Sequence, residues 1–210
     1  MTAIETTDGL TLEALWTDAA VPPVGVVVFC HPDPRRRGTM QAPLMRSVAR
    51  SLGAAGLHVL RFNFRGVGRS EGSWGGGRGE IDDVDAAVAA ASSAHPRIPL
   101  GIAGWSFGAV MALRWQARER SISRYVGIAP AIGLPGMLAV PAGGDLTAAD
   151  RLFVIGDRDQ FTPAWALADY AASIGGRLEV MSGCDHFFYF RHDRLAAVVA
   201  AHLGGRAGRP

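Results

Sequence analysis

Apolar and polar positions follow two different periods along the chain, and these periods predict strands that alternate with helices. Residues 24–30 (VGVVVFC) form a continuous, largely β-branched run, which is typical of a strand covered on both faces. Leu44, Val48 and Leu52 then recur at every fourth position, as on the buried face of a helix. The same change of period returns several times before the chain ends.

These criteria predict six further strands and four further helices. The strands are expected at residues 10–16, 58–64, 100–105, 125–129, 152–155 and 178–181, and the helices at residues 80–91, 109–118, 164–172 and 194–203. Residues 10–16 alternate in a way that fits an antiparallel pair at the edge of a sheet. The whole pattern predicts an α/β fold with a mostly parallel sheet of about seven or eight strands and helices on both faces.

The helix at residues 80–91 begins with several acidic residues. The helix dipole favours negative charge in a first turn, which explains their position there. Ile81, Val84, Val88 and Ala91 are expected to line the buried side of this helix.

Length and composition predict how the chain is divided into domains. It has 210 residues, of which 49% are hydrophobic. This predicts one domain with a substantial core over residues 1–204. The glycine-rich residues 205–210 are expected to form a flexible tail.

Charge and targeting signals restrict the partners. The formal net charge is +2, and the one basic run is the arginine triplet that starts at Arg35, so nucleic acid is not expected as a partner. The longest apolar run is too short for a membrane span, and the N-terminus lacks the features of a signal peptide. Two cysteines without a CxxC motif do not indicate a disulfide framework. We therefore expect a cytoplasmic monomer or homodimer that does not associate with membranes.

A serine held between two glycines marks the candidate site. Residues 100–111 (LGIAGWSFGAVM) run from a buried strand through Ser106 directly into a helix. Such a sharp reversal drives the serine toward positive φ, and Gly104 and Gly108 remove the side chains that would collide. This pattern predicts a nucleophile elbow, with the N–H of Phe107 free at the helix N-terminus to bind an oxyanion.

A serine hydroxyl needs a base and an acid that orients this base. Both are available after later predicted strands. Asp157 and Asp159 follow the strand at residues 152–155, and His186 follows the strand at residues 178–181. Because sites in parallel sheets form at the carboxyl ends of strands, these residues are expected to meet Ser106. Spacing alone does not decide between the two aspartates.

Five segments together resemble the α/β-hydrolases, and in particular their small, lidless serine hydrolases and esterases. They are FCHPDPRRRGTM, RFNFRGVGRSEG, GWSFG, GDRDQFTP and CDHFF, in the order that is typical of the family. The resemblance implies Ser106 as nucleophile, His186 as base and Asp159 as acid, because the family's acid stands three residues after a glycine, here Gly156. Asp157 is the alternative.

The resemblance also implies a second oxyanion donor. In related hydrolases it comes from a segment at the HPDP position, which assigns the role to the N–H of Asp33. Pro32 replaces the usual glycine and stiffens this loop, and Pro34 has no N–H to offer. His31 is interpreted as a buried hydrogen-bonding residue that shapes the loop.

The expected substrate is a small or surface-accessible carboxylic ester, hydrolysed through an acyl-enzyme. The connection at residues 130–150 is too short for a full lid, which favours an open site. Trp74, Trp105 and Phe187 are candidates for substrate contacts. Arg35 is a further candidate, because its arginine run could attract an anionic leaving group.

Several alternatives remain at this point. The same triad also serves thioesterases, lactone hydrolases and acyltransferases, and a non-catalytic ligand-binding protein is a possibility of a different class. No metal or other cofactor is expected, since neither an HExxH motif nor paired cysteines occur. Cys30 and Cys184 are interpreted as small side chains that fill tight space.

Overall fold

A single eight-stranded sheet runs through the computed structural model, which describes residues 2–204. The strand order is β1-β2-β4-β3-β5-β6-β7-β8. The strands are β1 (Thr2–Glu5), β2 (Thr11–Thr17), β3 (Gly25–Cys30), β4 (Leu57–Phe62), β5 (Leu100–Trp105), β6 (Arg124–Ile128), β7 (Arg151–Gly156) and β8 (Arg177–Met181). The predicted tail at 205–210 lies outside the described residues.

Strand directions agree with the predicted mostly parallel sheet. The strands β3 to β8 pair in parallel, whereas β1 and β2 add an antiparallel pair at one edge. All six residues of β3 are buried, as its continuous apolar run predicts. The strand expected at 58–64 ends earlier, at Phe62, because the N–H of Phe64 donates to His31 Nε2 instead of a neighbouring strand.

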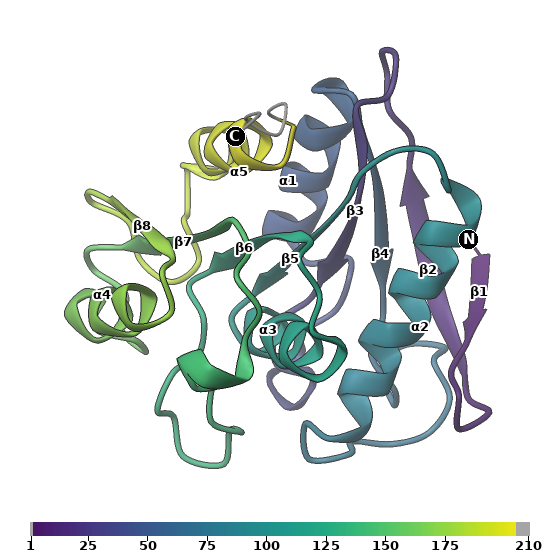
Figure 1. Cartoon of the computed structure of the whole chain (residues 1–210), viewed down its shortest axis with the longest axis horizontal. Coiled ribbons are helices and arrows are strands. Elements are labelled where there is room, and N and C mark those ends of the chain that lie inside the picture. Colours follow the sequence, from purple (N-terminus) through teal and green to yellow (C-terminus); the bar gives the residue numbers. More distant parts are fainter. Residues whose placement is uncertain (1, 205–210) are drawn as a thin grey trace.

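Helices cover both faces of the sheet (Figure 1). They are α1 (Pro43–Ala54), α2 (Gly79–Ala94), α3 (Phe107–Glu119), α4 (Ala164–Ser173) and α5 (His192–Gly204). Two hydrophobic cores result. One packs α1 and α5 on one face, and the other packs α2, α3 and α4 on the opposite face. No helix among residues 2–204 has the length and apolar character needed to cross a membrane.

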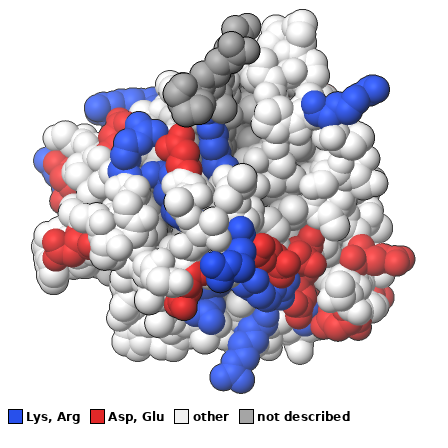
Figure 2. Space-filling view, in the orientation of Figure 1, with Lys and Arg blue, Asp and Glu red and all other residues white. Residues whose placement is uncertain are grey.

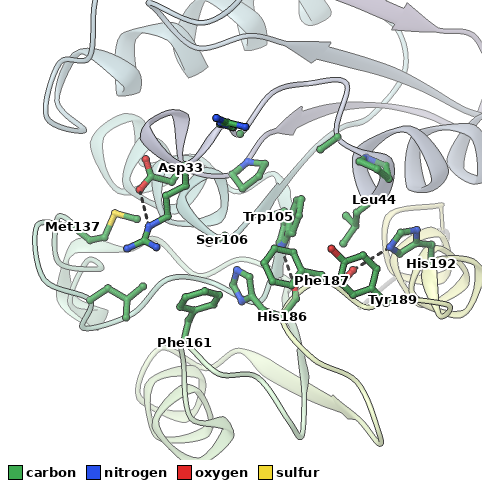
Figure 3. A pocket seen from close by; sticks show the side chains of 17 residues that line it. Asp33, Leu44, Trp105, Ser106, Met137, Phe161, His186, Phe187, Tyr189 and His192 are labelled. Carbon is green, nitrogen blue, oxygen red and sulfur yellow. Dashed lines mark hydrogen bonds and ion pairs between the residues drawn. The ribbon is translucent and has the colours of Figure 1, made fainter.

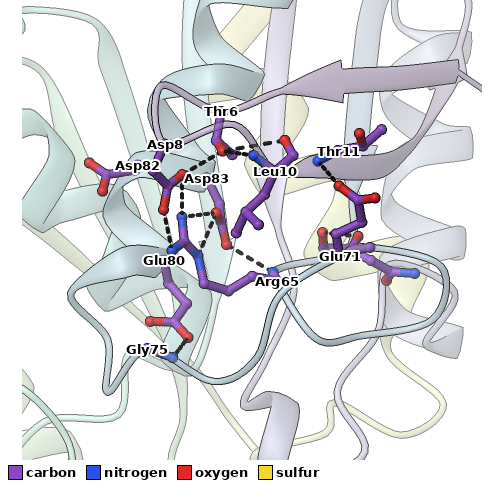
Figure 4. A network of polar contacts seen from close by, with 12 residues as sticks. Thr6, Asp8, Leu10, Thr11, Arg65, Glu71, Gly75, Glu80, Asp82 and Asp83 are labelled. Carbon is purple, nitrogen blue, oxygen red and sulfur yellow. Dashed lines mark hydrogen bonds and ion pairs between the residues drawn. The ribbon is translucent and has the colours of Figure 1, made fainter.

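A buried ion pair closes the glycine-rich loop after β4 (Figure 4). Arg65 Nη2 lies 2.7 Å from Asp83 Oδ1, and its Nη1 lies 2.9 Å from Asp8 Oδ2. Burial raises the pKa of Asp83, and the guanidinium of Arg65 offsets part of this effect. Glu80 accepts a hydrogen bond from the N–H of Gly75 at 2.7 Å. The loop that carries Trp74 is thereby fixed to α2.

The buried side of α2 contains the predicted Val84 and Ala91, and this ion pair adds charged residues to it. Glu80 and Asp83 are fully buried, whereas Ile81 and Val88 are only partly buried and pack at the edge of the core. Glu80 of the first turn and Asp83 of the next therefore hold the preceding loop, in addition to the favourable position of Glu80 near the helix N-terminus. The partner of Asp83, Arg65, stands too far away in the sequence for helical periodicity to reveal it.

Acidic and basic side chains lie next to one another on the face shown in Figure 2, over α2 and α3. Arg118 of α3 contributes to this region through ion pairs with Asp82 and Asp85 of α2. Opposite charges thus balance locally on this face.

Candidate active site

The predicted site residues all follow strands at the same edge of the sheet. Asp33 follows β3, Ser106 follows β5, Asp159 follows β7 and His186 follows β8. Since these strands are parallel, their carboxyl ends lie at one edge, which is where sites form in open α/β sheets.

Ser106 occupies a strained turn between β5 and α3. Its φ is 56° and its ψ is −116°, and its N–H donates to the carbonyl of Ile128 at 2.8 Å. A Cβ on Gly104 would lie 2.4 Å from the N of Ala109, and one on Gly108 would lie 2.4 Å from the carbonyl oxygen of Cys30. Both glycines are therefore required by close backbone approach, and the strain of about 1 to 3 kcal/mol at Ser106 is imposed by the surrounding strand and helix.

His186 contacts the carboxylate of Asp159 directly. Its Nδ1 lies 2.8 Å from Asp159 Oδ2. Asp159 Oδ1 accepts hydrogen bonds from the N–H groups of Phe161 at 2.8 Å and Thr162 at 2.9 Å. The Asp159 side chain is fully buried, so both of its oxygens are held by protein donors. This arrangement favours a proton on Nδ1 of His186 and leaves Nε2 as an acceptor.

Neighbouring side chains fix the position of the imidazole. Trp105 Nε1 donates to the carbonyl of His186 at 3.2 Å, and the N–H of His186 donates to Gln160 Oε1 at 3.3 Å. The ring of Phe161 meets the imidazole edge-on, with centroids 4.7 Å apart. His186 and Ser106 are both largely buried and line one cavity.

Asp157, the alternative acid, has a different environment. Its Oδ1 accepts the N–H of Gly183 at 2.7 Å, and its Oδ2 accepts the hydroxyl of Ser182 at 3.2 Å. It therefore caps the turn that follows β8. Of the two aspartates, Asp159 is the one that the structure brings to His186.

The loop after β3 is organised by His31 and Asp33. The fully buried His31 donates from Nδ1 to the carbonyl of Pro32 at 2.7 Å and accepts the N–H of Phe64 at Nε2. Burial lowers the pKa of His31 to about 4, so the ring is neutral. This agrees with the role in shaping the loop that the sequence suggests. The Asp33 carboxylate accepts three hydrogen bonds from Arg35, from its backbone N, Nε and Nη2 at 2.9, 3.1 and 3.0 Å.

Two backbone N–H groups near Ser106 lack acceptors among residues 2–204. They belong to Asp33, which lines the cavity, and to Phe107, the first residue of α3. Helix N-termini leave such donors free and add a partial positive charge. Both groups are thus available to an anion.

The side chains of Trp74 and Arg35 connect Phe107 with Asp33, the two residues that carry these donors. The ring of Trp74 packs against the ring of Phe107, with centroids 5.2 Å apart. The guanidinium of Arg35 lies 4.5 Å from the ring centroid of Trp74 and is bonded to Asp33. Trp74 and Arg35, which the sequence suggests as substrate contacts, do not line the cavity. The predicted contacts Trp105 and Phe187 do line it.

The cavity has a volume of about 380 Å³ (Figure 3). Lining residues beyond the predicted site include Arg36, Arg37, Leu44, Leu134, Met137, Phe161, Tyr189 and His192. Leu134 and Met137 belong to the connection at residues 130–150, which supplies a wall in place of a lid. His192 is bonded through Nε2 to the carbonyl of Phe187 at 3.0 Å. Arg36, Arg37 and Phe161 do stand in segments that the sequence singles out.

The described residues form no metal centre, and both cysteines are buried. Over residues 2–204, no three histidine, cysteine or acidic side chains are grouped so that they could hold a metal ion. Cys30 and Cys184 are both buried and free, and burial raises the pKa of each thiol. This environment favours the uncharged thiol and a packing role.

Comparisons with known proteins agree with this fold. The sequence model of the family described as serine aminopeptidase, S33, matches residues 22–153. An α/β serine hydrolase homologue from Coxiella burnetii is 28% identical, with 96% of each chain covered and a TM-score of 0.85. A lidless α/β serine hydrolase from Xanthomonas campestris is also 28% identical, covering 98% of this chain and 92% of its own, with a TM-score of 0.83. An esterase from Pyrococcus furiosus shares the fold at 21% identity, covering 97% of this chain and 89% of its own, with a TM-score of 0.79.

Proposed function

Because the chain belongs to the serine aminopeptidase S33 family of the α/β-hydrolase superfamily, we propose that it is a serine hydrolase of small or surface-accessible carboxylic esters. The observation that carries the proposal is the 2.8 Å contact between His186 and Asp159 beside a strained Ser106 in one cavity. A purely structural turn would need neither the buried carboxylate nor the oriented imidazole.

The first step of the proposed reaction is acyl transfer to Ser106. Nε2 of His186 takes the proton of the hydroxyl as Oγ attacks the ester carbonyl. Asp159 holds the imidazole in the required tautomer and stabilises its cationic form. The protonated His186 then gives the proton to the departing alcohol, which leaves an ester between the acyl group and Ser106.

The oxyanion of this step is proposed to lie between the N–H groups of Asp33 and Phe107. The contacts of Arg35 with Asp33 and with Trp74 support this role, because they hold the residues that carry both donors. Arg35 and Trp74 are therefore proposed as positioning residues. A lost or displaced oxyanion donor typically costs about 3 to 4 kcal/mol of transition-state stabilisation.

Water completes the proposed cycle. His186 takes a proton from the water as it attacks the acyl carbonyl, and then returns this proton to Ser106 as the carboxylic acid leaves. The enzyme is restored without any other reactant.

The charged residues that line the cavity favour an ester substrate over a peptide substrate with a free N-terminus. An aminopeptidase must bind a free ammonium group, for which a carboxylate is the natural partner. Asp33 supplies the one carboxylate among the residues that line this cavity in the described chain, and Arg35 already holds it. Arg36 and Arg37 would repel an ammonium group.

Kinetics with p-nitrophenyl butyrate test the proposal. We expect Ser106→Ala to lower kcat by roughly 10⁴-fold or more while the protein stays folded. Ser182→Ala is the matched control, because Ser182 lies at the same edge of the sheet and its hydroxyl donates to Asp157, outside the cavity. Equal loss in both variants, or full activity of Ser106→Ala, would contradict the proposal. The cytoplasmic location and the monomeric or dimeric state stay predictions from the sequence.

A further inference from the structure

The cavity extends to both sides of Ser106 and His186 (Figure 3). Asp33, Met137 and Phe161 lie on one side, and Leu44, Tyr189 and His192 lie on the other. Arg36 belongs to the first side, because its guanidinium carbon is 6.0 Å from the ring centroid of Phe161 and its Nε is 4.0 Å from Asp33 Oδ2. We call this first side, formed by Asp33, Arg36, Met137 and Phe161, the arginine side. The other, formed by Leu44, Phe187, Tyr189 and His192, is the aromatic side.

Positive charge on the arginine side is only partly compensated, because Arg35 and Arg36 share the single carboxylate of Asp33. The Asp33 carboxylate is already occupied by three hydrogen bonds from Arg35. At 4.0 Å, Arg36 Nε is beyond hydrogen-bond distance from the same carboxylate. Within residues 2–204, the guanidinium of Arg36 has no hydrogen-bond acceptor. Arg37 also lines the cavity, and no ion pair or hydrogen bond engages its side chain there.

The backbone keeps these two arginines at the cavity. Residues Pro34–Arg36 form a short 3₁₀ helix that Asp33 caps by accepting the N–H of Arg35. Arg37 follows with φ of 62°, and its N–H donates to the carbonyl of Pro34. The three consecutive arginines therefore have different environments. The guanidinium of Arg35 lies over Trp74, whereas Arg36 and Arg37 both line the cavity.

We infer that the substrate is an ester that also carries a carboxylate, which binds Arg36 and Arg37 while an apolar group fills the aromatic side. This inference rests on the proposed esterase function and names its substrate class. A guanidinium binds a carboxylate through two parallel hydrogen bonds, a geometry that a neutral ester cannot offer. The apolar walls formed by Met137 and Phe161 exclude part of the water that would otherwise screen this pair.

The expected effect is moderate, because 75% of the Arg36 side chain is exposed. Exposed ion pairs contribute little, and each of the two arginines is expected to change specificity about three- to fivefold. Together they should change it about tenfold. An effect of this size is measurable as a ratio of kcat/KM values.

Two pairs of substrates provide the test. For charge on the acyl group, p-nitrophenyl hemisuccinate is compared with p-nitrophenyl pentanoate. For charge on the leaving group, 4-acetoxybenzoate is compared with its methyl ester. The ratio of anionic to neutral kcat/KM is measured for the wild type, Arg36→Gln, Arg37→Gln and the double variant, so that intrinsic reactivity cancels.

Arg50→Gln is the matched control. Arg50 is an exposed arginine of α1 that does not line the cavity, so this variant makes the same change in net charge as each single variant. We expect the ratio to fall about tenfold in the double variant for at least one pair and to stay constant in Arg50→Gln. Raising the salt concentration from 20 mM to 0.5 M should lower only the anionic rates of the wild type. Equal ratios in all four proteins and the control would overturn the inference.

A binding measurement separates this inference from the proposed function. Ser106→Ala protein is titrated with the hemisuccinate and pentanoate esters by calorimetry, with and without Arg36→Gln. Tighter binding of the hemisuccinate that depends on Arg36 supports the anion site even if no ester is hydrolysed. Ser106-dependent hydrolysis without any preference for the anion would refute this inference and leave the esterase proposal intact.

Discussion

The loops on the two sides of Ser106 are built by different interactions. The loop at residues 31–38 is held by ionic and polar contacts, chiefly those of Asp33 with Arg35 and of His31 with the backbone. The loop at residues 184–192 combines hydrogen bonds, such as those of His186 with Trp105 and Gln160, with extensive aromatic packing. The rings of Phe187 and Tyr189 stack with centroids 5.5 Å apart, and Phe187 also meets Trp105 edge-on.

This difference assigns different tasks to the two loops. Polar contacts with defined directions can fix a backbone N–H relative to a reacting atom, as an oxyanion donor requires. Aromatic packing has less directional demand and creates a large apolar surface that suits many ligands. We therefore expect changes in the contacts between Asp33 and Arg35 to affect kcat, and changes at the exposed edge of the aromatic loop to affect KM.

The largest effect on kcat is expected from the loss of the contact between Asp159 and His186, the histidine of the aromatic loop. Asp159→Asn keeps an oxygen for the N–H groups of Phe161 and Thr162 but no longer favours the required tautomer of His186. We expect kcat to fall by about 10³- to 10⁴-fold without loss of folding. Steady-state kinetics with p-nitrophenyl butyrate measure this effect. Asp157→Asn is the control, and a larger loss there than in Asp159→Asn would reverse the assignment of the acid.

The polar loop should make stability depend on pH through His31. Its pKa of about 4 in the folded protein lies below the value of about 6.5 for an exposed histidine. Between these values the unfolded chain binds a proton that the native protein does not. The stabilising contribution is therefore complete above pH 6.5 and decreases as the pH falls toward 4.

We expect this contribution of His31 to change by about 3 kcal/mol across that range. Glutamine can donate to the carbonyl of Pro32 and accept from the N–H of Phe64, so His31→Gln should show a flatter profile. Urea unfolding at a series of pH values measures the difference between the two proteins. Parallel profiles would show that His31 is not held neutral.

Substitutions of Arg35 test whether its polar contacts position the oxyanion donors. Arg35→Ala removes the contacts of this side chain with Asp33 and Trp74, and we expect kcat to fall about 10- to 100-fold with little change in KM. Arg35→Lys retains the charge but not the paired hydrogen bonds, and should be intermediate. A rise in KM alone would instead indicate direct substrate binding.

The smallest effect is expected at the exposed edge of the aromatic loop. Tyr189 is 59% exposed and lines the cavity, so Tyr189→Ala should raise KM for apolar esters about two- to fivefold. Phe190→Ala is the control, since this adjacent aromatic residue is 95% exposed and does not line the cavity. If both variants or neither changed KM, the aromatic side would not contact the substrate.

Much of the sheet and the positions of three key residues could be predicted from the sequence. Buried strands such as β3 and β5 have continuous apolar runs, and the glycines around Ser106 reflect backbone contacts only a few residues apart. Asp159 and His186 follow strands, so the parallel topology alone places them at the correct edge. These are features of local sequence combined with a simple topological rule.

The directions of individual side chains could not be predicted in the same way. Arg35 and Arg36 are adjacent and chemically identical, yet only the position of Trp74 in another loop shows which of them lies outside the cavity. Leu134 and Met137 belong to a connection without periodicity. The burial of Asp83 depends on Arg65. Each of these outcomes is set by a partner distant in the sequence.

Reaction of the native protein with a fluorophosphonate tests the central claim most directly. The tryptic peptide at residues 98–114 contains Ser106 as its one hydroxyl-bearing residue, so the mass of this peptide reports the modification unambiguously. We predict that this peptide gains one phosphonyl group per chain, and that Asp159→Asn slows the reaction strongly while Asp157→Asn does not. An unmodified 98–114 peptide in folded protein would contradict an activated Ser106.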